Sequence, residues 1–319
     1  NLFAALLQDA ADNVAIIPAV SYGIALAAKN VKLERGQSIV VLEDQFPSNI
    51  YSWHGAAKEK GAFIIVVKRP EHSNWTSAVL DAISENTAVA ALPNCHWTDG
   101  TFIDLLKVGE KCRSVGAALV VDGTQSLGAM PFSISQIQPD FLITTAHKWL
   151  LGPYSLGFCY AAPKYHNGIP LEENWLNRAG SEDFSRLVDY RDEYQAGARR
   201  FDMGEASNFI LAPVAAAGLE QLLEWKVENI AATLKAKTDY LAEKAAEIGM
   251  KTAQADARSP HMLGILLPDG MAKVLSARLA AEKIYVSVRG DSIRIAPNVY
   301  NDDDDLERFL KVLKNSSGL

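Results

Sequence analysis

The side chains best suited to chemistry lie between Val120 and Pro153, where polar residues follow two short apolar runs. Asp122 ends the first run, and Lys148 follows the second run, Phe141–Thr145. Buried strands of a parallel sheet read as such runs, and ligands of these sheets bind beyond the carboxyl ends of the strands. We therefore expect Asp122 and Lys148 to lie side by side on one rim of a sheet.

A lysine amine beside a carboxylate suits pyridoxal 5'-phosphate (PLP) chemistry. Lys148 would form a Schiff base with the cofactor aldehyde, and Asp122 would keep the pyridine nitrogen protonated, so that the ring withdraws electrons. Trp149 and Leu150 follow the lysine directly. Such apolar neighbours should lower the pKa of the Lys148 amine, which makes it a better nucleophile and base.

Six residues of this stretch form one spaced pattern, D-G-x-Q followed by [ST]-x-H-K. They are Asp122, Gly123, Gln125, Thr145, His147 and Lys148. The pattern resembles the class V aminotransferase superfamily of fold-type I PLP-dependent enzymes, which includes cysteine desulfurases, kynureninase and isopenicillin-N epimerase-like proteins. The resemblance covers nearly the whole chain from about Asn13 onward. It implies a fold-type I transferase fold, PLP as the cofactor and an amino acid as the substrate.

Short apolar runs between helical patterns predict a seven-stranded sheet. The runs lie at residues 14–18, 38–42, 63–67, 88–92, 118–121, 141–145 and 156–160. Seven strands with interleaved helices favour an α/β domain of three layers. The resemblance adds that the sheet is mainly parallel and that its last strand runs antiparallel.

We expect two domains in the chain. Residues 13–205 would form the large PLP-binding domain, and residues 206–319 would form long connecting helices and a small C-terminal α/β domain. The helical pattern of residues 211–249 is predicted to break near 225–229. The chain begins at Asn1 without a Met, so the N-terminal arm of the family is expected to be missing.

A small, hydroxyl-bearing turn between a strand and a helix makes an anion site, because the first backbone N–H groups of a helix are unpaired. Ala19, Val20 and Ser21 form such a turn. The resemblance assigns the backbone of Ala19 and Val20, and Ser21, to the cofactor phosphate; the alternative for Ser21 is an ordinary helix N-cap. Thr145 and His147 are assigned to the same phosphate, the alternative for His147 being a hydrogen-bonded core histidine.

The resemblance also implies contacts with the cofactor ring. Phe46 would stack on the pyridine, where desulfurases usually carry His, and Gln125 would donate to the phenolic oxygen. Another polar contact would come from the next loop, where Asn94, His96 and Trp97 remain open alternatives.

Two further contacts are expected from the second half of the chain. The resemblance places Ser207, with Asn208 as a weaker choice, at the phosphate of the neighbouring subunit of a homodimer that shares its active sites. Arg294 would bind the α-carboxylate of the substrate through paired hydrogen bonds worth roughly 1.5–3 kcal/mol each. Arg289, which ends the preceding predicted strand, is a weaker choice for a residue that assists Arg294.

These residues predict an enzyme that acts on an amino acid through a Schiff base and removes its α-proton with Lys148. Amino transfer to an oxo acid is the first choice of reaction. A carbon–sulfur or carbon–selenium lyase and an epimerase are the alternatives, and a non-catalytic binding protein with this fold is a third. No cysteine follows Cys159, which counts against a desulfurase that forms a persulfide.

Bulk properties exclude several other classes. The net charge of −7 disfavours nucleic acid as a partner, and no stretch is long and apolar enough to span a bilayer. Cys95, Cys112 and Cys159 are widely spaced, without the pattern of a metal site. An odd, low count of cysteines is typical of the reducing cytoplasm, where we expect the protein to be located.

Overall fold

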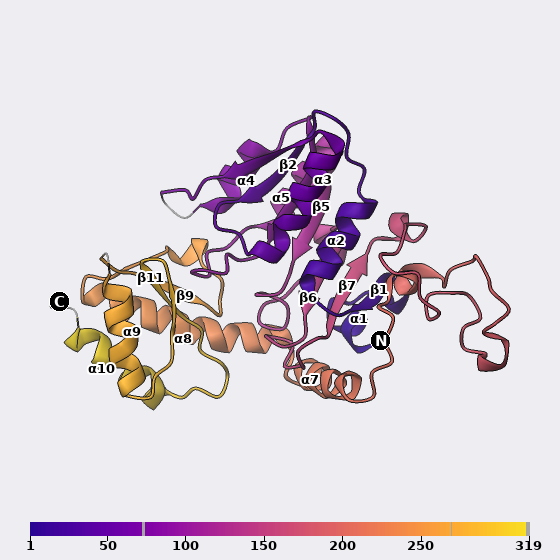
Figure 1. Ribbon diagram of the computed structural model, residues 1–319. Helices are drawn as coiled ribbons and strands as arrows, with labels where there is room; N and C mark the ends of the chain where they lie inside the picture. Colours follow the sequence, from indigo (N-terminus) through magenta and orange to yellow (C-terminus); the bar gives the residue numbers. More distant parts are fainter. Residues whose placement is uncertain (72–73, 269, 317–319) are drawn as a thin grey trace.

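The computed structural model describes residues 1–71, 74–268 and 270–316. Two sheets organise these residues, a seven-stranded sheet in the first part of the chain and a four-stranded sheet near the C-terminus. Figure 1 shows them as two bodies joined by the long helix α8 (Val227–Glu247).

The larger sheet has the predicted seven strands. They are β1 (Val14–Ile17), β2 (Ser38–Leu42), β3 (Phe63–Val67), β4 (Thr87–Pro93), β5 (Ala118–Asp122), β6 (Phe141–Thr145) and β7 (Gly157–Ala161). Their order in the sheet is β1-β7-β6-β5-β4-β2-β3. Strand β7 runs antiparallel to both of its neighbours, and the other pairs are parallel. The prediction of a mainly parallel sheet with an antiparallel last strand is confirmed.

Helices cover both faces of this sheet. On one face, Val120 packs in a core with α2 (Val20–Asn30) and α3 (Tyr51–Lys60). On the other face, Val121 packs in a core with helices α1 (Leu2–Leu7), α4 (Trp75–Ala82), α5 (Leu105–Val115) and α7 (Leu211–Trp225). Because successive strand residues point to opposite faces and both faces are buried, the strands read as continuous apolar runs. The predicted three-layer architecture is confirmed.

The smaller sheet is antiparallel and has helices packed on one face. Its strands, in sheet order, are β10 (Ser287–Arg289), β11 (Ser292–Ile295), β9 (Leu263–Leu266) and β8 (Lys251–Thr252). Helices α8, α9 (Met271–Ala281) and α10 (Asp303–Asn315) supply the rest of its core. Strand β8 carries no sequence signal, since two residues are too few to show a period. The domain boundary near residue 205 remains a prediction.

Helices α7 and α8 meet at the predicted break. Lys226 lies between them with a φ of 65°. A left-handed backbone ends a helix, because it turns the next peptide out of the hydrogen-bond ladder. The remaining short elements are α6 (Ile134–Ile137) and 3-10 turns at Ala11–Asn13, Pro47–Asn49, Pro163–Tyr165, Phe184–Arg186, Gly197–Phe201 and Ala255–Ala257.

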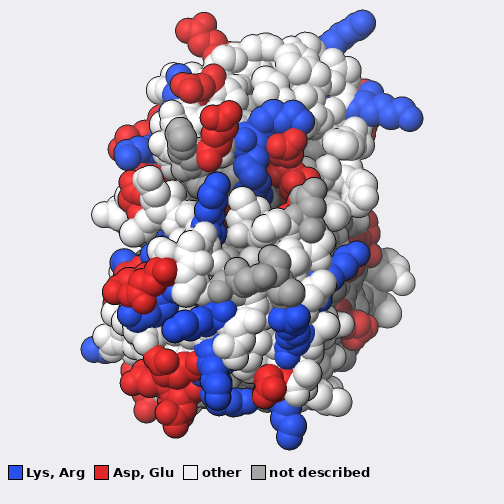
Figure 2. Space-filling model, turned by 90° about the vertical axis from the view of Figure 1, so that its left-hand side faces the viewer, with Lys and Arg blue, Asp and Glu red and all other residues white. Residues whose placement is uncertain are grey.

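Residues 163–200 form a long excursion that projects from the side of the molecule opposite the small sheet (Figure 1). On the face shown in Figure 2, acidic and basic side chains are interspersed. Within the described residues, no helix is both long and apolar enough to span a membrane.

Candidate active site

Strands β5 and β6 bring a carboxylate and an amine to the same rim. Asp122 is the last residue of β5 and pairs with Ile143 of the neighbouring β6, and Lys148 follows β6 by three residues. The Asp122 carboxylate is buried and accepts a hydrogen bond from the backbone N–H of Thr124 at 3.0 Å. Burial raises the pKa of Asp122, and Lys148 opposes this rise as an attracting charge.

A tight loop holds Lys148 in place. The backbone N–H of Gly152 donates to the carbonyl of Ala146 at 2.8 Å, and Leu151 adopts a φ of 56°. Helix α7 packs against this loop at Gly218, where a Cβ atom would lie 2.7 Å from the carbonyl oxygen of Leu150. Only glycine allows an approach this close.

The surroundings of the lysine favour its neutral form. Burial is the main cause of a lowered pKa for the Lys148 amine; Arg294 and Arg289 lower it further as like charges, and Asp122 opposes them. The ammonium nitrogen lies 5.4 Å from the centre of the Phe46 ring. A lowered pKa makes a lysine a better nucleophile and base than an ordinary surface lysine.

Trp97 connects Phe46 to the two arginines. Its ring meets Phe46 edge to face at 5.5 Å, and its Nε1–H donates to the carbonyl of Asp44 at 2.6 Å. The Arg289 guanidinium lies 5.1 Å from the centre of the indole, and Arg294 donates to the Trp97 carbonyl through Nη1. Trp97 is thus one of the contacts between the active-site rim and the small sheet.

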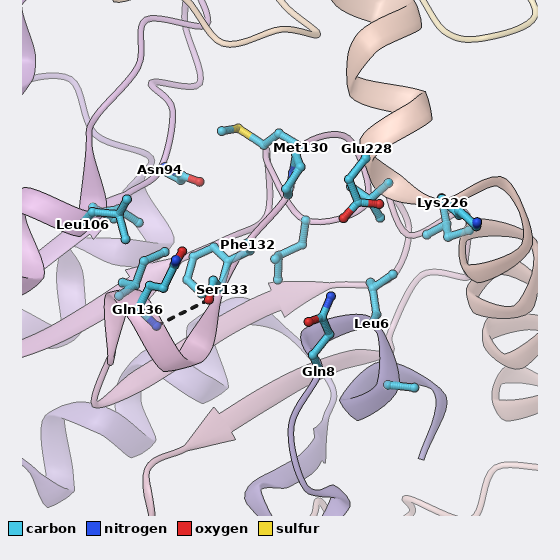
Figure 3. A pocket seen from close by; sticks show the side chains of 18 of the residues that line it. Leu6, Gln8, Asn94, Leu106, Met130, Phe132, Ser133, Gln136, Lys226 and Glu228 are labelled. Carbon is cyan, nitrogen blue, oxygen red and sulfur yellow. Dashed lines mark hydrogen bonds between the residues drawn. The ribbon is translucent and has the colours of Figure 1, made fainter.

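The other two alternatives in this loop lie elsewhere. His96 is fully buried, stacks on Trp75 at 5.2 Å and forms a 3.0 Å hydrogen bond to the carbonyl of Glu43 through Nε2. Burial lowers the pKa of His96. Asn94 donates to the carbonyl of Ile103 at 3.0 Å and lines a separate pocket of about 400 Å³ between α1, α5 and the α7–α8 junction (Figure 3). Of the three, only Trp97 contacts Phe46 and the arginines.

The predicted phosphate site consists of a helix start and a hydroxyl–imidazole pair. Ala19 is the N-cap of α2 and Val20 its first residue, so the alternative of Ser21 as N-cap is wrong. The assignment of Ala19, Val20 and Ser21 to the phosphate remains a prediction. No side chain caps this helix. Thr145 Oγ1 and His147 Nδ1 are 2.5 Å apart.

Tyr154 completes this group, which the sequence did not indicate. Its ring stacks on His147 with a centroid distance of 3.7 Å. Burial and the Lys148 charge lower the pKa of His147, which favours a neutral imidazole. Tyr154 lies in an irregular loop after Pro153, where neither period nor motif distinguishes it.

A second residue that the sequence did not indicate is His261, from the loop before β9. It is fully buried, donates through Nε2 to the backbone carbonyl of Gln125 and packs against Trp149. The same carbonyl accepts from the thiol of Cys95 at 3.3 Å. Burial lowers the pKa of His261 to about 4 and raises the pKa of the Cys95 thiol. Cys95 therefore packs as an inert thiol, as its apolar surroundings favour.

Ser207 and Asn208 lie at the start of α7. Ser207 is exposed, whereas Asn208 Oδ1 accepts from the backbone N–H groups of Ile210 at 3.0 Å and Leu211 at 2.7 Å. Asn208 thus has a structural role at the helix start. Next to it, Phe209 is 91% exposed.

The residues on the rim fit PLP. Among the described residues, no cation lies within ion-pair distance of the buried Asp122 carboxylate, so its charge needs a partner such as a protonated pyridine nitrogen. The uncapped start of α2 offers backbone N–H groups to a phosphate. Phe46 offers a flat apolar surface beside the Lys148 amine.

Comparison with known proteins identifies the family. The model of the family "Aminotransferase class-V" matches residues 2–308. The chain belongs to the class V aminotransferase family. This is a family of PLP-dependent enzymes, and its members include aminotransferases and cysteine desulfurases.

Relatives in the class V family differ in their reactions. The chain is 26% identical to the uncharacterised aminotransferase YcbU of Bacillus subtilis over 97% of this chain and 80% of that protein. It is 22% identical to the isopenicillin N epimerase of Streptomyces clavuligerus over 96% of this chain and 80% of the epimerase.

Solved structures share the fold. The cysteine desulfurase of Thermococcus onnurineus NA1 superposes with a TM-score of 0.84 at 19% identity, over 100% of this chain and 82% of that one. The cystine C–S lyase C-DES superposes with a TM-score of 0.86 at 17% identity, over 98% of this chain and 84% of the lyase. The predicted fold-type I architecture with its small C-terminal domain is confirmed.

Proposed function

We propose that this class V enzyme is an aminotransferase that uses PLP bound to Lys148. The observation that supports the proposal is the placement of three groups: Asp122 ends the strand beside the one that leads to Lys148, the Lys148 amine lies 5.4 Å from the centre of the Phe46 ring, and Arg294 donates to the carbonyl of Trp97, whose ring meets Phe46. An amine, a carboxylate and a guanidinium are the groups that the cofactor and an α-amino acid require.

Each residue has a separate task in this proposal. PLP, when bound, supplies an aldehyde that links to amines and a ring that withdraws electrons. Asp122 holds the proton on the ring nitrogen, Phe46 covers one face of the ring, and Arg294 orients the substrate by its α-carboxylate. Lys148 removes the α-proton, and burial supports this role because it lowers the pKa of the amine and so favours the neutral form that can accept a proton.

The cysteines favour transfer over persulfide formation. Cys95, Cys112 and Cys159 are all free and buried. Burial raises the pKa of Cys112 to about 12 and that of Cys159 to about 12. A thiol that must leave the core and ionise is a poor sulfur acceptor.

A homodimer with shared sites is part of the proposal. Ser207 is exposed beside two exposed apolar residues, Phe209 and Ile210, at the start of α7. Adjacent exposed apolar side chains mark contact surfaces. A second subunit that covers these residues would bring its own active site to Ser207. The Ser207 hydroxyl would then contact the phosphate bound in that second subunit.

We also propose that the protein is located in the cytoplasm. Its substrates would be an amino acid, which donates the amino group, and an oxo acid, which accepts it. The three free, buried thiols support a reducing compartment.

The test is a single-turnover reaction of the PLP-loaded protein with a panel of amino acids and no oxo-acid acceptor. An aminotransferase keeps the amino group on the cofactor, so absorbance and mass spectrometry would show the pyridoxamine form. Release of ammonia or a sulfur product would indicate a lyase, and inversion at the α-carbon would indicate an epimerase. Either outcome contradicts amino transfer.

A further inference from the structure

Strands β10 and β11 place two arginines on one face of the small sheet. Arg294 is opposite Ser287 in the register, and Arg289 lies two residues beyond Ser287 on the same strand. Residues two apart point to the same face, so Arg289 and Arg294 are diagonal neighbours, with Cα atoms about 7–8 Å apart. The opposite face carries Ile293, which is buried in the small-domain core.

Both guanidinium groups contact Trp97, whose ring meets Phe46 beside the Lys148 amine: the Arg289 guanidinium lies 5.1 Å from the centre of the indole, and Arg294 donates to the Trp97 carbonyl. In line with this placement, both arginines lower the pKa of the Lys148 amine, after the larger effect of burial. Two cations and a lysine therefore share one region. Arg289 also lines the cleft of about 950 Å³ between the two sheets, with Trp97 and Gly264.

No ion pair neutralises either arginine within the described residues, although Asp99 and Asp291 line the same cleft as Arg289. Among the described residues, no carboxylate pairs with either arginine; the nearby Asp99 is paired with Arg69 at 2.5 Å. The Nε–H groups of Arg289 and Arg294 are buried and have no hydrogen-bond partner in the described part of the chain. Arg289 also stacks on Trp97 and donates from Nη1 to the carbonyl of Val288 at 2.7 Å. Buried donors of charged groups without acceptors are costly.

We propose that Arg289 binds a second anionic group on the side chain of the substrate, so that the enzyme prefers acidic amino acids such as aspartate or glutamate. The proposal rests on the proposed function, in which Arg294 takes the α-carboxylate. A dicarboxylic amino acid presents two anions to two neighbouring guanidinium groups. An amino acid with a neutral side chain leaves the Arg289 Nε–H without an acceptor.

The experiment compares succinate with butyrate as ligands of the PLP-loaded protein. The two acids have the same carbon number, lack an amino group and differ in one carboxylate. Isothermal titration calorimetry at fixed ionic strength should show that succinate binds at least about tenfold more tightly, given the strength of a charged hydrogen bond. Equal affinities in the unmodified protein would overturn the proposal.

Variants test the residue. Arg289→Gln should remove the preference for succinate and leave butyrate binding unchanged, and Arg289→Lys should keep part of it. Lys251→Gln, which removes a charge from the same cleft, should keep all of it. Loss of affinity for both acids in Arg289→Gln would mean that Arg289 only supports Trp97, and would overturn the proposal.

A parallel measurement separates this proposal from the proposed function. Proton exchange at the α-carbon of alanine and of glutamate is followed in deuterated water. If the α-protons of alanine and glutamate exchange at equal rates, the proposed PLP enzyme stands and the proposed preference for acidic amino acids is rejected. A protein that holds no PLP through Lys148 would reject the proposed function itself. The expected result is faster exchange of glutamate, lost in Arg289→Gln.

Discussion

At the scale of single residues, Lys148 and Asp122 form an amine and a carboxylate whose burial has opposite consequences. Burial lowers the pKa of Lys148 and raises the pKa of Asp122. In the absence of a charged partner, burial therefore favours the neutral form of each group. The neutral amine is ready to attack an aldehyde. The ionised carboxylate would be stabilised by a protonated ring nitrogen, to which it would offer a hydrogen-bond acceptor.

Lys148→Ala should abolish covalent attachment of PLP, because no other amine is placed beside Phe46 and Asp122 among the described residues. Reduction with borohydride followed by mass spectrometry should show the PLP adduct in the unmodified protein and none in the variant. Lys251→Ala is the control, since Lys251 is an exposed lysine. A PLP adduct in Lys148→Ala would refute the assignment.

Asp122→Asn should retain PLP but slow α-proton removal by about 10²–10³-fold, the usual loss when one preorganised electrostatic partner is removed. The amide oxygen can still accept from the Thr124 N–H, so the local fold is kept. The measurement is the rate of α-proton exchange in deuterated water at saturating amino acid. A rate within a few-fold of the unmodified protein would contradict the role of Asp122.

At the scale of elements, the contact between α7 and the Lys148 loop sets the position of the lysine. Two backbone carbonyls approach Gly218 of the helix so closely that a Cβ atom would lie 2.7 Å from Leu150 O and 2.8 Å from Leu151 O. Backbone atoms cannot move aside as a flexible side chain can. Either the helix or the lysine loop must then shift.

Gly218→Ala should therefore lower the melting temperature and weaken PLP binding. In an open helical position the same change would stabilise the helix by roughly 0.5–1 kcal/mol. Gly55→Ala in α3 is the matched control, because nothing lies within 4 Å of its added Cβ. We expect the melting temperature, measured by calorimetry, to rise in Gly55→Ala and fall in Gly218→Ala. An equal rise in both would show that the contact is not tight.

At the scale of the whole molecule, His261 ties the C-terminal part of the chain to the active-site rim. Its Nε2–H donates to the carbonyl of Gln125, while its Nδ1 is buried without a partner in the described residues. The folded protein thus holds a neutral imidazole. Protonation at Nδ1 would place a charge where no acceptor is available.

The contribution of His261 to stability should depend on pH. The folded pKa of about 4 lies below the ordinary value of 6.5, so the unfolded chain binds a proton first as the pH falls. The contribution is complete above pH 6.5 and is lost progressively down to pH 4, by up to about 3 kcal/mol. Asp202 acts oppositely, since burial raises its pKa to about 6.

His261→Gln isolates this term, because the opposing effect of Asp202 is present in both proteins. Urea unfolding at pH 7 and pH 4.5 should show a smaller loss of free energy of unfolding in the variant than in the unmodified protein. Parallel losses in the two proteins would mean that His261 does not titrate with folding.

The sequence predicted the sheet well because burial on both faces leaves continuous apolar runs with clear ends. β6 was placed at its observed bounds, and the break between α7 and α8 was placed at Lys226 within a few residues. β8 was missed because two residues show no period. The sequence could not decide which of Asn94, His96 and Trp97 faces the active site, because a loop has no regular period that would show which side chains point the same way.

What the sequence determined by itself was the chemistry: an amine and a carboxylate at the ends of neighbouring strands, in a pattern specific to one family. What only the tertiary structure decided was which side chains surround them. Trp97 could be chosen among three candidates only from its contacts, and His261 and Arg289 come from parts of the chain far from Lys148. The positions of His261 and Arg289 depend on how the small sheet packs against the large one, and such long-range packing leaves no local period in the sequence. Tyr154 is close to Lys148 in the chain, but its irregular loop shows neither a period nor a motif.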